Sequence, residues 1–239
     1  MLRFGRSAEA RQARRLRDVR LWSQPPATRR ARLRAWSNML LADHGIFRLV
    51  YPNYHWLSPR AARAAQPSPG LIRRFAREGG RSVLSLRGGL MFGSLPLEIE
   101  ACEEAGLVFS RVQVRSRQLP SPEEFRAILA AMRAAEPPVL YHCKSGADRA
   151  GFVSVLHMHL IEGAPLEVAM RQLSLRYGHM RQARTGILDH FFETYRDTAR
   201  PGQSLEDWVE DGYDPARIAA SFHESRGWSW LVDKVLRRE

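Results

Sequence analysis

The stretch that decides the fold is Val139-Leu140-Tyr141-His142-Cys143-Lys144-Ser145-Gly146-Ala147-Asp148-Arg149-Ala150-Gly151. Its first three residues are apolar and follow two prolines, which predicts a short buried strand. After Arg149 the apolar residues recur at helical spacing, so a helix should begin there. A strand that runs into a helix through a few small residues leaves unpaired backbone N–H groups, which favour an anion together with the helix dipole. The sequence therefore predicts an anion-binding loop.

This loop holds one cysteine and, six positions later, one arginine. A thiol beside a helix N-terminus and a guanidinium loses its proton easily, so we expect Cys143 to be a thiolate nucleophile. Arg149 offers a planar fork that can hold two phosphate oxygens. A thiolate below a cradled phosphate is the starting point for phosphoryl transfer to sulfur. The other residues expected to bind phosphate are Lys144, Ser145, Gly146 and Ala147.

An apolar strand before His142 and a glycine at position 151 complete the pattern, which resembles the His-Cys-x5-Arg signature of cysteine-dependent protein tyrosine and dual-specificity phosphatases. The segments Arg63-Ala64-Ala65-Gln66-Pro67-Ser68 and Leu86-Arg87-Gly88 resemble a bacterial dual-specificity-like branch. The resemblance implies hydrolysis of phosphate monoesters through a cysteinyl-phosphate intermediate, with no cofactor. The histidines form no convincing metal-ligand set. A rhodanese-like sulfurtransferase is the nearest rival, but an arginine at the sixth position favours phosphate.

Alternating strand and helix patterns with glycine stops predict an α/β fold. We expect a central, mostly parallel sheet flanked by helices, phosphotyrosine phosphatase-like, with extra N- and C-terminal helices. Residues 1–45 should form a basic extension and helix, residues 46–197 the phosphatase domain, and residues 198–239 a C-terminal helical extension. At the start of the expected phosphatase domain, the apolar run of residues 46–51 suggests a strand.

The chain has 239 residues, of which 44% are hydrophobic, enough for one domain with extensions. Its formal net charge of +12 comes almost entirely from arginine. The basic residues 1–27 fit either an amphipathic helix on an anionic membrane or RNA, or a partly disordered extension that packs one or two apolar residues. We favour the extension because the apolar stripe is discontinuous.

Two cysteines are too few for a disulfide framework, and a thiolate nucleophile needs a reducing compartment. We therefore expect a cytoplasmic protein. No apolar run has membrane-spanning length. The expected partner is a phosphorylated protein, inositol phosphate or lipid phosphate. Nucleic-acid binding is not expected, peripheral membrane contact through the basic N-terminus stays open, and the sequence does not define the oligomeric state.

Cleavage of a phosphate ester requires a proton for the leaving oxygen. The family usually supplies it from an Asp well upstream of the cysteine, but the corresponding loop here, residues 114–120, has no carboxylate. Asp148, inside the phosphate loop, could donate the proton, or could instead hold the loop by hydrogen bonds. A good leaving group such as a phosphoanhydride would need little acid. Glu123, Glu124 or Asp189 could also reach the site.

Further residues are candidates for the rim of the site. Arg87 could either bind substrate at the carboxyl edge of the sheet or form a structural salt bridge. Arg117 could clamp additional anionic groups, which would suit inositol phosphates and lipid headgroups. Gln182, with His179, could position the attacking water, although ordinary surface residues beside a helix cap at Thr185 are the alternative.

One more departure concerns the residue after the arginine. The branch usually has Ser or Thr there, which helps the thiolate to leave the phospho-enzyme, whereas this chain has Ala150. Breakdown of the intermediate should then be slow. The alternative function is therefore a phosphate-binding pseudophosphatase with little turnover.

Overall fold

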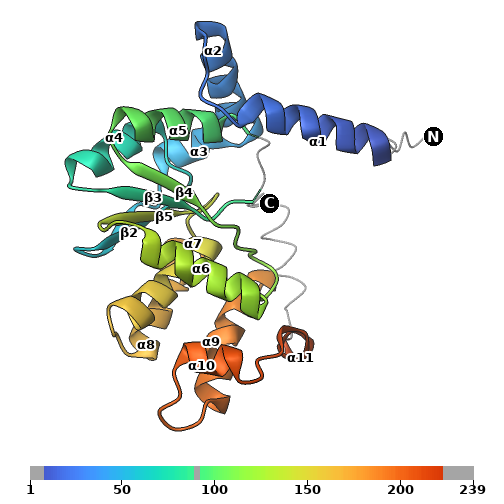
Figure 1. The fold of residues 1–239 in the computed structure, drawn as a ribbon, viewed down its shortest axis with the longest axis vertical. Coiled ribbons are helices and arrows are strands. Elements are labelled where there is room, and N and C mark those ends of the chain that lie inside the picture. Colours follow the sequence, from blue (N-terminus) through green and yellow to red (C-terminus); the bar gives the residue numbers. More distant parts are fainter. Residues whose placement is uncertain (1–7, 89–91, 223–239) are drawn as a thin grey trace.

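A five-stranded sheet forms the centre of the protein, with helices on both faces (Figure 1). The structure is a computed structural model, and it describes residues 8–88 and 92–222. The strand order is β1-β2-β5-β3-β4, and only β1 runs antiparallel to its neighbour. The predicted α/β class with a mostly parallel sheet is thus confirmed. The strands are β1 (His55–Ser58), β2 (Ala61–Ala64), β3 (Ser82–Ser85), β4 (Val108–Arg111) and β5 (Val139–His142).

Both faces of the central strands are buried, as expected for parallel strands covered by helices. Val83 and Leu140 pack on one face with the apolar side chains of α4 (Pro69–Arg77) and α5 (Ser94–Glu104). Leu84 and Tyr141 face the other side and join a larger core. The elements on that side are α6 (Pro122–Ala134), α7 (Asp148–Leu156), α8 (Leu166–Ala169), α9 (Ile187–Thr198), α10 (Leu205–Glu210) and α11 (Pro215–Ser221).

Side-chain caps define where several helices begin. Thr28 accepts a hydrogen bond from the N–H of Ala31 and starts α2 (Arg29–Ser37). Ser68 caps α4 in the same way. Ser121 forms a capping box with Glu124 at the start of α6. Shorter helical turns are η1 (Asn38–Ala42), η2 (His157–Ile161), η3 (Met170–Gln172), η4 (Leu175–Tyr177) and η5 (Arg184–Gly186).

The basic N-terminal region contains helix α1 (Ala8–Trp22), so its residues 8–22 are helical rather than disordered. Its last residue packs beside Ala35 and Leu97, as expected for an extension that packs one or two apolar residues. One expectation for the segment that follows is wrong. The predicted strand over residues 46–51 is instead α3 (Gly45–Val50). Its Gly45 is buried and its Arg48 turns inward, three positions apart, which is a helical period that the apolar neighbours hide in the sequence.

The predicted C-terminal helical extension is present in α10 and α11. Residues 223–239, the last part of the expected C-terminal helical extension, lie outside the described residues. Among the residues that the structure describes, none of the helices combines the length and the apolar character needed to cross a membrane.

Candidate active site

The phosphate loop, residues 143–149, connects β5 to α7 at the carboxyl edge of the sheet. Its first carbonyls are held by residues that follow or precede β2. The backbone N–H of Gln66 donates to the carbonyl of Lys144 at 3.2 Å. The Nδ2 of Asn53 donates to the carbonyl of Ser145 at 3.1 Å. Because the C=O and the following N–H of a peptide point in opposite directions, these bonds turn the next amides away from β2.

Arg63, on β2, holds the next two carbonyls of the loop. Its Nη2 donates to the carbonyl of Gly146 at 2.6 Å and to that of Ala147 at 3.0 Å. Four consecutive carbonyls are therefore bonded on one side of the loop. Their amide partners are left on the other side, which is the arrangement of an anion-binding nest.

The side chain of Arg63 is completely buried. Burial lowers its pKa to about 10, against the opposing effect of the negative charges expected at Cys143 and Asp148. The guanidinium lies 4.1 Å from the centre of the Tyr177 ring, a cation–π contact. The sequence pattern placed Arg63 in a family-like segment but did not identify it as a site residue. Its single charge in the otherwise apolar run Ala61-Ala62-Arg63-Ala64 could have identified it, because a buried charge needs hydrogen-bonding or ionic partners.

Cys143 lies at the base of the loop and is 1% exposed. Its Sγ accepts a hydrogen bond from the N–H of Gly146 at 3.2 Å. Gly146 has φ +73°, and a Cβ there would lie 2.6 Å from the nitrogen of Ala65. The loop therefore needs glycine both for its backbone conformation and for its close approach to the end of β2.

Asp148, the first residue of α7, is 4% exposed and bonded to a buried histidine. His179 donates from Nδ1 to Asp148 Oδ1 at 2.7 Å and from Nε2 to Asp189 Oδ2 at 2.6 Å. Burial would lower the pKa of His179, but the two carboxylates raise it to about 9. The ring is thus an imidazolium at neutral pH, and it fixes the carboxylate that precedes Arg149. This placement fits the loop-holding alternative for Asp148.

The other carboxylates considered as proton donors are also engaged. Glu124 belongs to the capping box of α6 and pairs with Arg115, with 2.6 Å between Oε1 and Nη1. Asp189 is bonded to His179 as described. Glu123 accepts from the hydroxyl of Ser121 at 2.8 Å.

A pocket of about 890 Å³ opens above the loop and is rich in cations. Among the described residues that line it, none carries a carboxylate. Burial lowers the pKa of the Lys144 ammonium, Asp43 raises it, and the neighbouring arginines lower it further. The lining includes the predicted residues Arg87, Arg117, Lys144 and Arg149, together with Phe92, Gln113, Arg115, Ser116 and Arg184.

Gln182, by contrast, is an exposed side chain outside this lining. Arg184, two residues later, takes a place in the pocket that the sequence did not predict. Both belong to the polar, glycine-punctuated connection before α9. Sequence spacing identified the segment but not which side chain enters the pocket.

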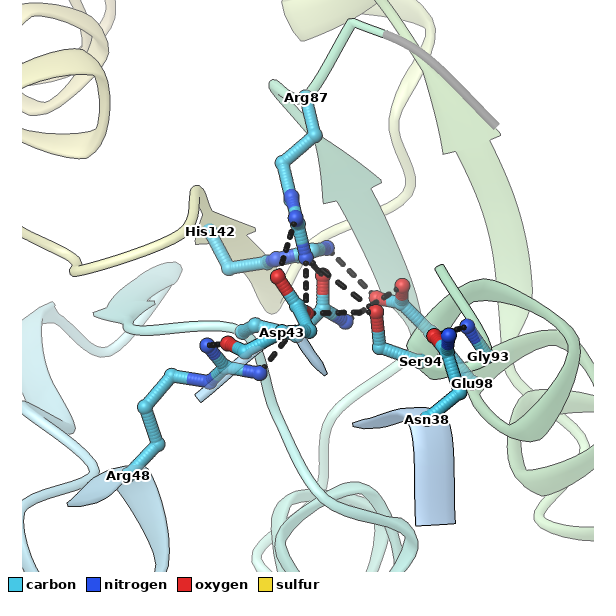
Figure 2. Close-up of polar contacts among 9 residues, drawn as sticks. Asn38, Asp43, Arg48, Arg87, Gly93, Ser94, Glu98 and His142 are labelled. Carbon is cyan, nitrogen blue, oxygen red and sulfur yellow. Dashed lines mark hydrogen bonds and ion pairs between the residues drawn. The ribbon is translucent and has the colours of Figure 1, made fainter. Parts of the chain in front are cut away.

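Arg87 forms the structural salt bridge considered above and also lines the pocket. Its Nη1 and Nη2 donate to the two carboxylate oxygens of Asp43, each at 2.9 Å (Figure 2). Arg48 donates to Asp43 Oδ2 at 2.8 Å, and the hydroxyl of Ser94 donates to the same oxygen at 2.8 Å. Burial would raise the pKa of Asp43, but the two arginines and the Ser94 hydroxyl lower it below its ordinary value. Asp43 is therefore an ionised, fully buried hub.

A second chain of contacts joins this hub to the residue before the cysteine (Figure 2). His142 Nε2 lies 2.6 Å from Glu98 Oε1, and both side chains are buried. Gln66 donates from Nε2 to Glu98 Oε2 at 2.8 Å and accepts from Arg87 at 2.7 Å. The phosphate loop is thus connected, through side chains alone, to the N-terminal segment that carries Asp43.

The comparison with protein families agrees with the phosphate loop. Residues 103–219 match the model of the tyrosine phosphatase family, as the loop predicts. No curated protein matches the chain.

Within residues 8–88 and 92–222, no group of three or more His, Cys, Asp or Glu side chains is placed to hold a metal ion.

Three solved structures are similar at low sequence identity. TpbA of P. aeruginosa, in complex with pTyr, is 18% identical with a TM-score of 0.47, over 68% of this chain and 93% of that one. Tk-PTP in its active form is 19% identical with a TM-score of 0.41, over 72% and 99%. PTPMT1 in complex with PI(5)P is 18% identical with a TM-score of 0.45, over 62% and 99%.

Proposed function

Because residues 103–219 match the tyrosine phosphatase family, we propose that the protein hydrolyses phosphate monoesters with Cys143 as nucleophile and Arg149 as phosphate clamp. One observation carries this proposal. Four consecutive loop carbonyls are bonded from behind, and the N–H of Gly146 donates to the Cys143 sulfur, which supports a phosphate cradle beside that sulfur. Such preorganised donors stabilise the charge that develops on a transferring phosphoryl group.

The reaction proceeds in two displacements at phosphorus. Cys143 Sγ attacks the phosphorus, the bond to the leaving oxygen breaks, and the phosphoryl group is held as cysteinyl-phosphate. The loop amides and the guanidinium of Arg149 bind the equatorial oxygens in this step. A water molecule then attacks the phosphorus, the S–P bond breaks, and inorganic phosphate and the free cysteine are released.

We assign Asp148 a positioning role, because its carboxylate is bonded to His179. The described pocket lining contains no carboxylate that could protonate the leaving oxygen. The mechanism then favours substrates whose leaving oxygen is weakly basic, such as aryl phosphates and phosphoanhydrides. The arginines and Lys144 around the pocket favour a multiply charged substrate over a singly charged one.

The central test replaces the nucleophile and uses the second cysteine as its control. Cys143→Ser should abolish hydrolysis of p-nitrophenyl phosphate, measured under reducing conditions. Cys102→Ser should retain it, because Cys102 is buried in α5 and burial raises its pKa far above the ordinary value. Unchanged activity in Cys143→Ser would refute the proposal.

The second candidate, a phosphate-binding protein with little turnover, is favoured by Ala150, which is fully buried directly after the arginine. A rapid burst of one p-nitrophenol per protein, followed by a stall with phosphate on Cys143, would establish it. Linear product release over many turnovers would exclude it. Mass spectrometry of the quenched protein distinguishes the two, because cysteinyl-phosphate accumulates only in the first case.

The finer assignments follow from the same mechanism. We propose that residues 46–197 form the phosphatase unit, between an N-terminal region of residues 1–45 and a C-terminal region of residues 198–239. Because a thiolate nucleophile needs a reducing compartment, we propose the cytoplasm as its location. We also propose that the enzyme accepts both phosphotyrosine and phosphoserine substrates and that its basic N-terminus contacts a membrane.

A further inference from the structure

The segment formed by η1 and α3 exposes an unusual number of large apolar side chains. Phe47 is 72% exposed, Val50 is 86% exposed, and the others are more than half exposed. They are consecutive or adjacent on two elements that pack together. Contiguous exposed apolar surface on a folded protein marks a place where another surface binds. We call this set the α3 patch; it consists of Leu41, Ile46, Phe47, Leu49 and Val50.

The outward direction of the patch is fixed by the structure rather than by fraying. On α3, Gly45 is buried and Arg48 points into the protein, where it donates to both the carbonyl and the carboxylate of Asp43 (Figure 2). Asp43 is itself held by Arg87. Since positions 45 and 48 face inward, positions 46, 47 and 50 lie on the opposite face of this helix and point away from the protein.

The surroundings of the patch are strongly basic. Residues 8–50 contain ten arginines and three acidic residues. One of the three, Asp43, is buried and paired with two arginines, so it does not offset the charge at the surface. Four arginines of α2 are exposed: Arg29, Arg30, Arg32 and Arg34. Large apolar side chains set among arginines match the two layers of an anionic bilayer, acyl chains below and negative headgroups above.

The patch also lies close to the reaction centre. The charge of Arg48, on the inner side of α3, interacts with Arg87 and with Cys143. Arg87 lines the cationic pocket. Arg48 and Arg87 are both bonded to Asp43, so one carboxylate joins α3 to the cationic pocket.

From these observations we propose that the α3 patch docks the protein onto an anionic lipid bilayer. Phe47, Val50 and their apolar neighbours insert at the level of the acyl boundary, and the exposed arginines of α2 contact the headgroups. The proposal does not depend on turnover at Cys143, since it concerns binding alone.

The experiment measures co-sedimentation of the full chain with vesicles of phosphatidylcholine alone or with phosphatidylserine added. The wild-type protein should bind the vesicles that contain phosphatidylserine, and binding should fall as salt screens the headgroups. The double variant Phe47→Ser with Val50→Ser should bind about tenfold more weakly or worse, because two inserted apolar side chains are lost. The matched double variant Val108→Ser with Val168→Ser changes two exposed valines outside the patch and should bind as the wild type does.

Thermal melts show that each variant is folded, which we expect because all four side chains are exposed. Equal binding of the two double variants would overturn the proposal, since charge alone would then explain it. The proposal also fails if the wild-type protein does not bind the vesicles but sediments as a dimer in ultracentrifugation, and the Phe47→Ser, Val50→Ser variant sediments as a monomer. In that case a second copy of the chain occupies the patch.

Discussion

The buried imidazolium of His179 makes the stability of this protein depend on pH in a defined direction. Its pKa is raised from 6.5 to about 9 by Asp148 and Asp189, against the effect of burial. A pKa raised by folding stabilises the native state fully below the lower value, and the stabilisation is lost as pH rises through the higher one. The difference corresponds to about 3 kcal/mol below pH 6. Most of this stabilisation remains at pH 7, and almost none at pH 9.5.

The perturbation is His179→Gln, which keeps the approximate size but cannot carry the charge. At pH 7 the variant should lose at least about 2 kcal/mol of unfolding free energy, because two buried carboxylates also face each other without a cation. The free energy of unfolding is measured by urea titration, with tryptophan fluorescence and a reductant present. The difference in unfolding free energy between wild type and variant should decrease by about 2 kcal/mol from pH 7 to pH 9.5.

The control is His159→Gln, because the ring of His159 contacts a backbone carbonyl, that of Ala164, at 2.9 Å. Its gap from the wild type should stay constant over the same pH range. If the gap for His179→Gln also stayed constant, His179 would not be charged in the native state, and the assignment of Asp148 as a residue that it positions would lose its basis.

Three further predictions concern the phosphate loop. Asp148→Asn should lower kcat/KM by the same factor on an aryl and an alkyl phosphate, whereas a larger loss on the alkyl ester would make Asp148 the proton donor. Arg63→Met should weaken inhibition by orthovanadate roughly 10- to 100-fold, since two carbonyls lose a charged donor; an unchanged inhibition constant would contradict this. Gly146→Ala should destabilise the protein by at least ~2 kcal/mol more than Gly163→Ala in urea titrations. Both glycines have φ near +70°, but only the first approaches another backbone; equal losses would show that the approach is harmless.

The phosphate loop could be predicted because its signals are local. The strand, the cysteine, the glycine and the arginine fall within thirteen consecutive residues, and each has a role that depends on its neighbours in the chain. The caps at Thr28, Ser68 and Ser121 were predictable for the same reason, since a cap acts on an amide three residues away.

The supporting residues could not be predicted because their partners are distant in the sequence. Arg63 bonds a carbonyl 83 positions later, and His179 bonds a carboxylate 31 positions earlier. The spacing of apolar residues along the sequence does not predict contacts between residues so far apart. The strand prediction for residues 46–51 was wrong for another reason. These six mostly apolar residues fit a strand and a helix equally well, and only the salt bridge of the inward-pointing Arg48 with Asp43 distinguishes the two.

The ion hub at Asp43 has a consequence for how this sequence can change during evolution. Loss of the carboxylate would leave the guanidinium groups of Arg48 and Arg87 facing each other in a buried site. A tolerated substitution at position 43 should therefore arrive together with one at position 87 or 48. Homologous sequences should show these positions as a covarying set, even though 44 residues separate Asp43 from Arg87. The N-terminal segment and the phosphatase sheet would thus be inherited as one unit.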